Sequence, residues 1–167
     1  MLSGALEFEA HHGDSTTARA LARKVVAWHQ GHPNPSPTTG RSLQEGRAWL
    51  LLGNLDSAVF HLRRAARATA IGNTGTLGVA LALRGDTLRA RQLADSLGGL
   101  DRKWLFGAHT LWQGQILGAL GEREAAVRLL QQAFVAGQCK AGLHYSLTLR
   151  SLRGYPSFEA LLTPQQH

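Results

Sequence analysis

Eight histidines are the residues of this chain that could form a metal site, and they occupy positions 11, 12, 29, 32, 61, 109, 144 and 167. Zinc sites built on a helix need spacings such as His-Glu-x-x-His, or histidine paired with cysteine. Only His11 and His12 are adjacent in sequence, and neighbouring helical residues point about 100° apart. We therefore expect no metal ion.

Cys139, which precedes Lys140, is the one candidate thiol nucleophile, and a single cysteine excludes an internal disulfide. No supporting triad is visible. The motifs Gly-x-Ser-x-Gly and Gly-x-x-x-x-Gly-Lys-Ser/Thr, which position a serine nucleophile and cradle a phosphate, are both absent. Acidic residues such as Asp56, Asp86 and Asp101 fall where helix N-caps are needed. The sequence thus predicts no enzyme activity and no cofactor.

The chain carries a net charge of +7. Its basic residues are dispersed, which is typical of solvated helix faces, and no cluster of five to eight occurs. Arg63, Arg64 and Arg67 form the best local group. They support an alternative function in nucleic-acid binding, which steep salt dependence would identify.

The elements that position these residues follow from a repeat. Three times a glycine is followed by a second glycine seven residues on and by an alanine twelve residues on, with steps of 32 and 36 residues between triplets. The triplets are Gly46/Gly53/Ala58, Gly78/Gly85/Ala90 and Gly114/Gly121/Ala126. Such a period is typical of stacked helical hairpins.

The spacing predicts how each hairpin packs. A glycine at a helix centre costs about 1 kcal/mol relative to alanine, so Gly46, Gly78 and Gly114 need a packing reason. We expect close approach to the second helix of the same hairpin, where Ala58, Ala90 and Ala126 are the small partners. The turn glycines Gly53, Gly85 and Gly121 are expected to adopt positive φ.

Four segments are expected along the chain: a degenerate first helical repeat at 1–30, a proline-rich linker at 31–40, three repeats at 41–137 and a C-terminal capping segment at 138–167. Residues 71–75 are predicted to break the chain between helices. Asp56 is expected to cap a helix over 58–68, and Asp101 a long helix ending at Leu120. Pro156 should begin a short terminal helix that covers the end of the array.

Four tryptophans, at 28, 49, 104 and 112, are spread along the chain. Trp104, Ala108 and Trp112 fall on one helical stripe at i, i+4 and i+8. We expect these rings in the core between repeats rather than as anchors for a partner.

The pattern Gly46-x-x-Trp49 followed by Ala58-x-x-x-Leu62-x-x-Ala65 resembles the tetratricopeptide repeat family. Gly114-x-x-Leu117 with Ala126-x-x-x-Leu130 is similar to it as well. The resemblance implies an all-α fold of α-α hairpins stacked into a short right-handed solenoid. It also implies a concave groove that binds a partner, at the positions Arg47, Leu50, Leu51, Val79, Ala82, Leu83, Gln115, Gly118 and Ala119.

The C-terminal stretch from Ser151 to Leu162 is similar to the end of repeat blocks in bacterial serine/threonine kinases and transcriptional regulators. Together these features predict a protein-interaction scaffold in a bacterial signalling protein, with a protein or peptide partner. No apolar run approaches the ~20 residues that span a bilayer. With no secretory signal and one cysteine, a cytoplasmic location and no membrane association are expected.

Overall fold

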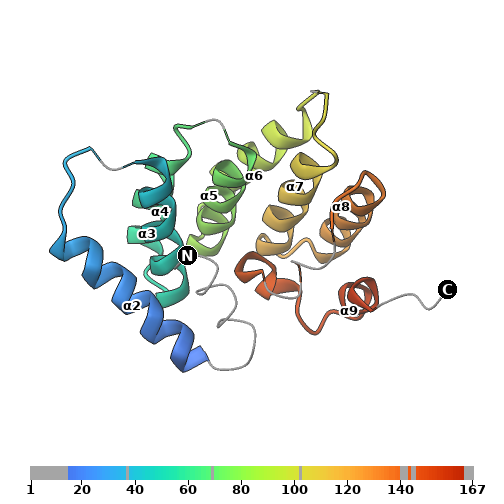
Figure 1. Ribbon diagram of the computed structural model, residues 1–167. Coiled ribbons are helices and arrows are strands. Elements are labelled where there is room, and N and C mark those ends of the chain that lie inside the picture. The colour runs from blue at the N-terminus through green and yellow to red at the C-terminus, as the bar shows by residue number, and fades with distance from the viewer. Residues whose placement is uncertain are drawn as a thin grey trace.

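The computed structural model describes residues 15–36, 38–68, 70–101, 103–139, 143 and 146–163, and these contain helices but no strand. The elements are α2 (Ser15–Gly31), α3 (Thr39–Leu52), α4 (Leu55–Ala65), α5 (Ile71–Arg84), α6 (Thr87–Gly98), α7 (Ala108–Ala119), α8 (Arg123–Val135), the 3₁₀ helix η2 (Leu147–Leu152) and α9 (Pro156–Leu162). The fold is therefore all-α, as predicted (Figure 1).

Successive helices pack as hairpins, namely α3 with α4, α5 with α6 and α7 with α8. Each hairpin turns at one of the three predicted glycines, where φ is +81° at Gly53, +89° at Gly85 and +88° at Gly121. Neighbouring hairpins stack, because α4 packs on α5, α6 packs on α7, and α5 also contacts α7. Figure 1 shows the hairpins following one another across the molecule, with α2 at one end and α9 at the other.

The three repeat glycines lie at close helix contacts, but not all with the same partner. A Cβ on Gly46 would lie 2.5 Å from Leu62 Cγ, and one on Gly114 would lie 3.1 Å from the Ala126 carbonyl oxygen. Both contacts are with the second helix of the same hairpin, as expected. A Cβ on Gly78 would instead collide with Ile116 of α7, so this glycine allows the next hairpin to approach.

The core follows the small-residue positions. Ala58, Ala90 and Ala126 have no exposed surface and belong to one cluster that extends from α4 to α9. A second cluster joins α2 to α3 through Ala18, Ala22 and other residues, and it includes Leu147 of η2.

The first helix of the second hairpin is longer than the sequence indicates. Residues 71–75, expected as a break, form the first turns of α5. Gly72 and Gly75 lie against the ring of Trp112, and the Asn73 side chain donates a buried hydrogen bond to the Ala65 carbonyl oxygen at 3.0 Å. These turn-forming residues are thus tolerated in the helix because they pack under a tryptophan.

Two helix starts also differ from the prediction. Asn54, not Asp56, caps α4, because its side chain accepts a hydrogen bond from the backbone N–H of Ser57 at 3.1 Å. The helix expected after Asp101 begins only at Ala108, and Gly107 before it has φ +79°. A Cβ on Gly107 would lie 2.7 Å from the Ala133 carbonyl oxygen, which explains the need for glycine there.

The ends of the array fit the prediction only in part. Thr39 and Gly40 of the expected linker already belong to α3, which Thr38 caps, and residues 1–14 of the expected first repeat lie outside the described residues. The short terminal helix is confirmed, with Pro156 in its first turn and Phe158 buried against the core. No described helix is both long enough and apolar enough to cross a membrane.

Candidate interaction surfaces

The groove positions implied by the repeat resemblance lie on α3, α5 and α7. We call the surface that these positions form the first-helix face. Leu51, Val79, Ala82, Gln115 and Gly118 are buried, whereas Arg47, Leu50 and Ala119 are half-buried and Leu83 is exposed. Leu50 and Leu83 line a cavity of about 210 Å³ together with residues of η2. The structure therefore brings α3 and α5 positions together at the chain's own C-terminal segment.

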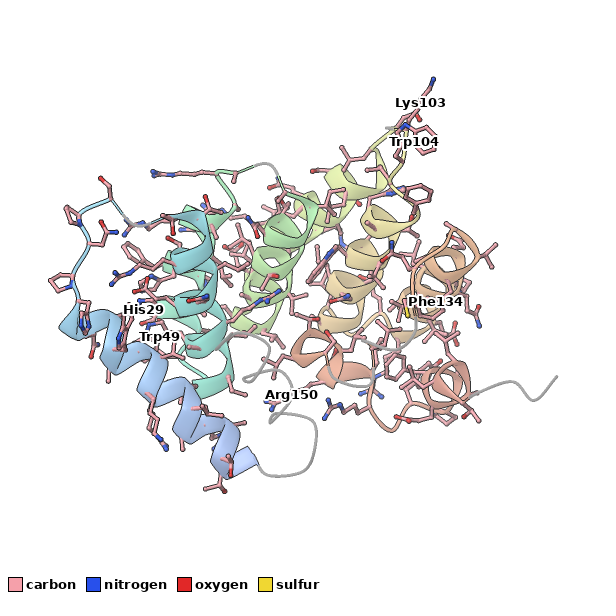
Figure 2. All side chains as sticks on the ribbon, viewed as in Figure 1. His29, Trp49, Lys103, Trp104, Phe134 and Arg150 are labelled. Carbon is pink, nitrogen blue, oxygen red and sulfur yellow. The ribbon has the colours of Figure 1, made fainter. Side chains whose placement is uncertain are left out.

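The helix η2, which the sequence analysis missed, packs on this face. Thr148 donates a buried hydrogen bond to Gln115 Oε1, and Leu152, fully buried, contacts α7 where Gly118 leaves room for it. Leu147 reaches the α2–α3 cluster. Figure 2 shows η2, marked by Arg150, below α5 and α7. The apolar residues of Leu147-Thr148-Leu149-Arg150-Ser151-Leu152 were the available signal, although their spacing fits neither a helix nor a strand.

The second helices carry a different surface. A cavity of about 440 Å³ opens between α4, α5 and α6. Leu77 and Leu81 of α5 and Leu93 of α6 contribute apolar side chains, and Arg63, Arg89 and Gln92 contribute polar ones. Because Leu77 and Leu81 are buried whereas Arg63, Arg89 and Gln92 are exposed, the cavity has an apolar floor and a polar rim.

A second cavity of about 400 Å³ adjoins the first through Arg63, which lines both. It is bordered by Asp56, Val59, Phe60, Arg63, Arg64, Arg67 and Arg84. Phe60 is 58% exposed, and the Arg64 guanidinium lies 5.8 Å from the centre of its ring. We call Phe60 and the five arginines around the two cavities (Arg63, Arg64, Arg67, Arg84 and Arg89) the arginine face.

The five arginines differ in their partners. Arg84 forms ion pairs with Asp56 at 3.5 Å and with Asp86 at 3.2 Å, and Arg89 also pairs with Asp86. Arg63, Arg64 and Arg67 have no ion pair with any carboxylate of the described part of the chain. On the arginine face, these three guanidinium groups therefore carry charges that no carboxylate of the described residues offsets.

A buried polar cluster ties α2 to the first hairpin. Glu45 Oε2 lies 2.8 Å from His61 Nδ1, and Glu45 Oε1 lies 3.9 Å from His29 Nδ1 and 3.5 Å from Arg41 Nε. Burial lowers the pKa of His29 and of His61, although the Glu45 carboxylate opposes both shifts. No set of three or more metal-ligating side chains within the described residues could hold an ion. The contacts of Glu45 thus join His29 of α2 and His61 of α4 to α3.

The tryptophans do not share one environment. Trp112 packs in the core as expected, but Trp104 is 81% exposed and lies outside α7 with φ +67°. The prediction for Trp104 is wrong because the helix begins after it. Figure 2 shows Trp104 and Lys103 at the tip of the turn before α7. Trp28 is also exposed, at 54%, so the expectation of a core position is wrong for this residue as well.

Comparison of the chain with protein-family models, curated proteins and solved structures finds no match. The interpretation of its surfaces therefore depends on the geometry given above.

Proposed function

We propose that this chain is a protein-interaction scaffold, built of tetratricopeptide-like hairpins in a short right-handed solenoid and belonging to a bacterial signalling protein. The packing of sequential hairpins, with contacts between the first helices α5 and α7, supports the repeat architecture. Arrays of this kind present extended surfaces on rigid helices.

The arginine face is the observation that carries the proposal. It combines an exposed aromatic ring, cations without carboxylate partners in the described residues and a cavity with an apolar floor. Aromatic and arginine side chains beside a desolvated pocket are typical of interface hot spots. On the first-helix face, by contrast, η2 already packs against α7.

Affinity capture with matched variants tests the proposal. The tagged full chain is incubated with nuclease-treated lysate of its source organism, and bound proteins are quantified by mass spectrometry. Phe60→Ser removes the exposed ring of the arginine face, whereas Val135→Ser changes a 92% exposed apolar residue on α8. We expect specific proteins to be lost with Phe60→Ser and retained with Val135→Ser. If the wild-type chain captures no protein beyond the tag alone, the scaffold function is refuted.

Nucleic-acid binding is the second candidate, because Arg63, Arg64 and Arg67 lie together on one surface. Contacts with phosphates release counterions, so log K should fall with log[salt] with a slope of about −0.9 per phosphate contact on duplex DNA. This candidate would be favoured if Arg67→Gln reduces the slope and if substitution of an arginine outside the arginine face leaves the slope unchanged.

A further inference from the structure

We infer that the arginine face binds an acidic segment of a partner protein that inserts apolar side chains into the cavity between α4 and α6. The inference rests on the proposed scaffold function and names the class of partner and the residues that recognise it.

The shape of the site favours a peptide. The two cavities, of about 440 and 400 Å³, share Arg63 of α4 as a lining residue. Each lies within the range of about 300–1,000 Å³ that is usual for ligand pockets. The half-buried Leu93 supplies accessible apolar surface to the first cavity, and Leu77 and Leu81 beneath are 8% and 3% exposed, so the floor is held by the core and does not need to reorganise when a partner binds.

The charges of the site favour carboxylates. Five arginines surround the cavities, opposed by Asp56 and Asp86, and both aspartates are already paired with Arg84. Arg63 lies where both cavities meet, so its guanidinium can form a bidentate pair with a carboxylate while the partner's chain continues on either side. Arg64 is held over the Phe60 ring, which limits its freedom before binding.

The same observations disfavour a nucleic acid at this site. The apolar floor offers nothing to a charged backbone, and Phe60 is the only aromatic ring that lines either cavity in the described structure. Binding of single strands without sequence preference needs several rings on which successive bases stack.

Selection from a displayed library of random peptides tests the inference with the full chain. We expect the selected peptides to be enriched in Asp or Glu together with Leu, Ile or Phe. The strongest binder, labelled with fluorescein, is then titrated in a fluorescence-anisotropy assay. Its affinity should fall roughly tenfold or more with Arg63→Glu. It should also fall roughly tenfold when the leading apolar residue of the peptide is replaced by serine.

Two controls separate recognition from general charge. Arg23→Glu makes the same change in charge at an exposed position of α2, and the affinity should change less than about threefold, since exposed charges interact weakly over distance. A peptide in which one acidic residue is changed to lysine should bind Arg63→Glu better than it binds the wild type. Circular dichroism of both variants must match the wild type, which the exposure of Arg63 and Arg23 leads us to expect.

The unfavourable outcomes are distinct. Selected peptides without acidic residues, or peptide binding that Arg63→Glu leaves unchanged, would overturn the inference. The proposed scaffold function would still stand if the chain captures specific proteins from lysate. A single-stranded DNA 20-mer that binds more tightly than the best peptide, and is lost with Arg63→Glu, would reassign the face to nucleic acid. If no peptide is selected and no protein is captured, both the inference and the proposed function fail.

Discussion

Gly46→Ala tests the packing argument at a single atom. A Cβ at this position would lie 2.5 Å from Leu62 Cγ, 2.7 Å from Leu62 Cδ2 and 3.2 Å from the Leu62 backbone nitrogen. Leu62 has no exposed surface and belongs to the main core cluster, so its side chain cannot swing into solvent. The new methyl group must push α3 and α4 apart or displace a branch point of a buried side chain.

Two opposing terms set the magnitude of the change. Overpacking of a core costs about 1–3 kcal/mol. Replacing glycine by alanine in a helix interior gains about 1 kcal/mol. Because the clash involves a buried branch point and a backbone atom, we place the cost in the upper part of its range. The free energy of unfolding should therefore fall by about 1–2 kcal/mol.

Urea unfolding followed by circular dichroism measures the effect, with Gly40→Ala as the matched control. Gly40 belongs to the same helix, and a Cβ there would meet no atom within 4 Å. This control should leave the urea midpoint unchanged or raise it, since alanine gains up to about 1 kcal/mol. Equal shifts in the two variants, or a Gly46→Ala midpoint at or above that of the wild type, would refute the reasoning.

Two further predictions concern buried polar groups. Burial lowers the pKa of His29 and of His61 below their ordinary value of 6.5, so the unfolded chain binds more protons than the folded chain near that pH. The free energy of unfolding should therefore be highest above pH 6.5 and should decrease as the pH falls below it. Urea midpoints at pH values of about 7.5 and 5.5 measure this loss, which His61→Gln should reduce because glutamine does not titrate. Thr148→Val leaves the Gln115 oxygen without its buried donor and should cost about 1–3 kcal/mol, whereas Thr163→Val, at an exposed hydroxyl, should cost less than about 0.5 kcal/mol by the same unfolding assay. Equal midpoint shifts for the two threonine variants would contradict the role given to that hydrogen bond.

The fold class and the hairpin turns could be predicted because their signals are local. Positive φ at Gly53 and Gly85 could be predicted from a glycine that directly follows an expected helical segment. The start of α5 could not be predicted in this way. Gly72, Asn73 and Gly75 are residue types typical of turns, and the contact with Trp112 that accompanies their helical conformation comes from a distant part of the sequence. Helix propensities differ by about 1 kcal/mol or less for most residues, and a tertiary contact overrides them easily.

For the interaction surfaces, the sequence could predict which residues cluster along the chain but not the cavities that they line. The sequence identifies the group Arg63, Arg64 and Arg67, since all three lie within five residues. The cavity beside them depends on Leu77, Leu81 and Leu93, which belong to another hairpin and reach the site only when α4, α5 and α6 are assembled. Likewise, no local pattern indicates that Thr148 bonds to Gln115, because the pair is separated by 33 residues.

A helical array can offer a partner only the surface that its own chain leaves uncovered. Here a short segment closes on the first helices, with Leu152 buried where Gly118 leaves space and Thr148 joined to a buried glutamine. A partner that bound at these positions would first have to break that hydrogen bond and expose Leu152, and burying a leucine side chain is worth about 1.5–3 kcal/mol. A partner at the arginine face meets no such cost, because Phe60, Arg63 and Arg67 are already exposed. Recognition through the second helices is therefore the less costly of the two routes.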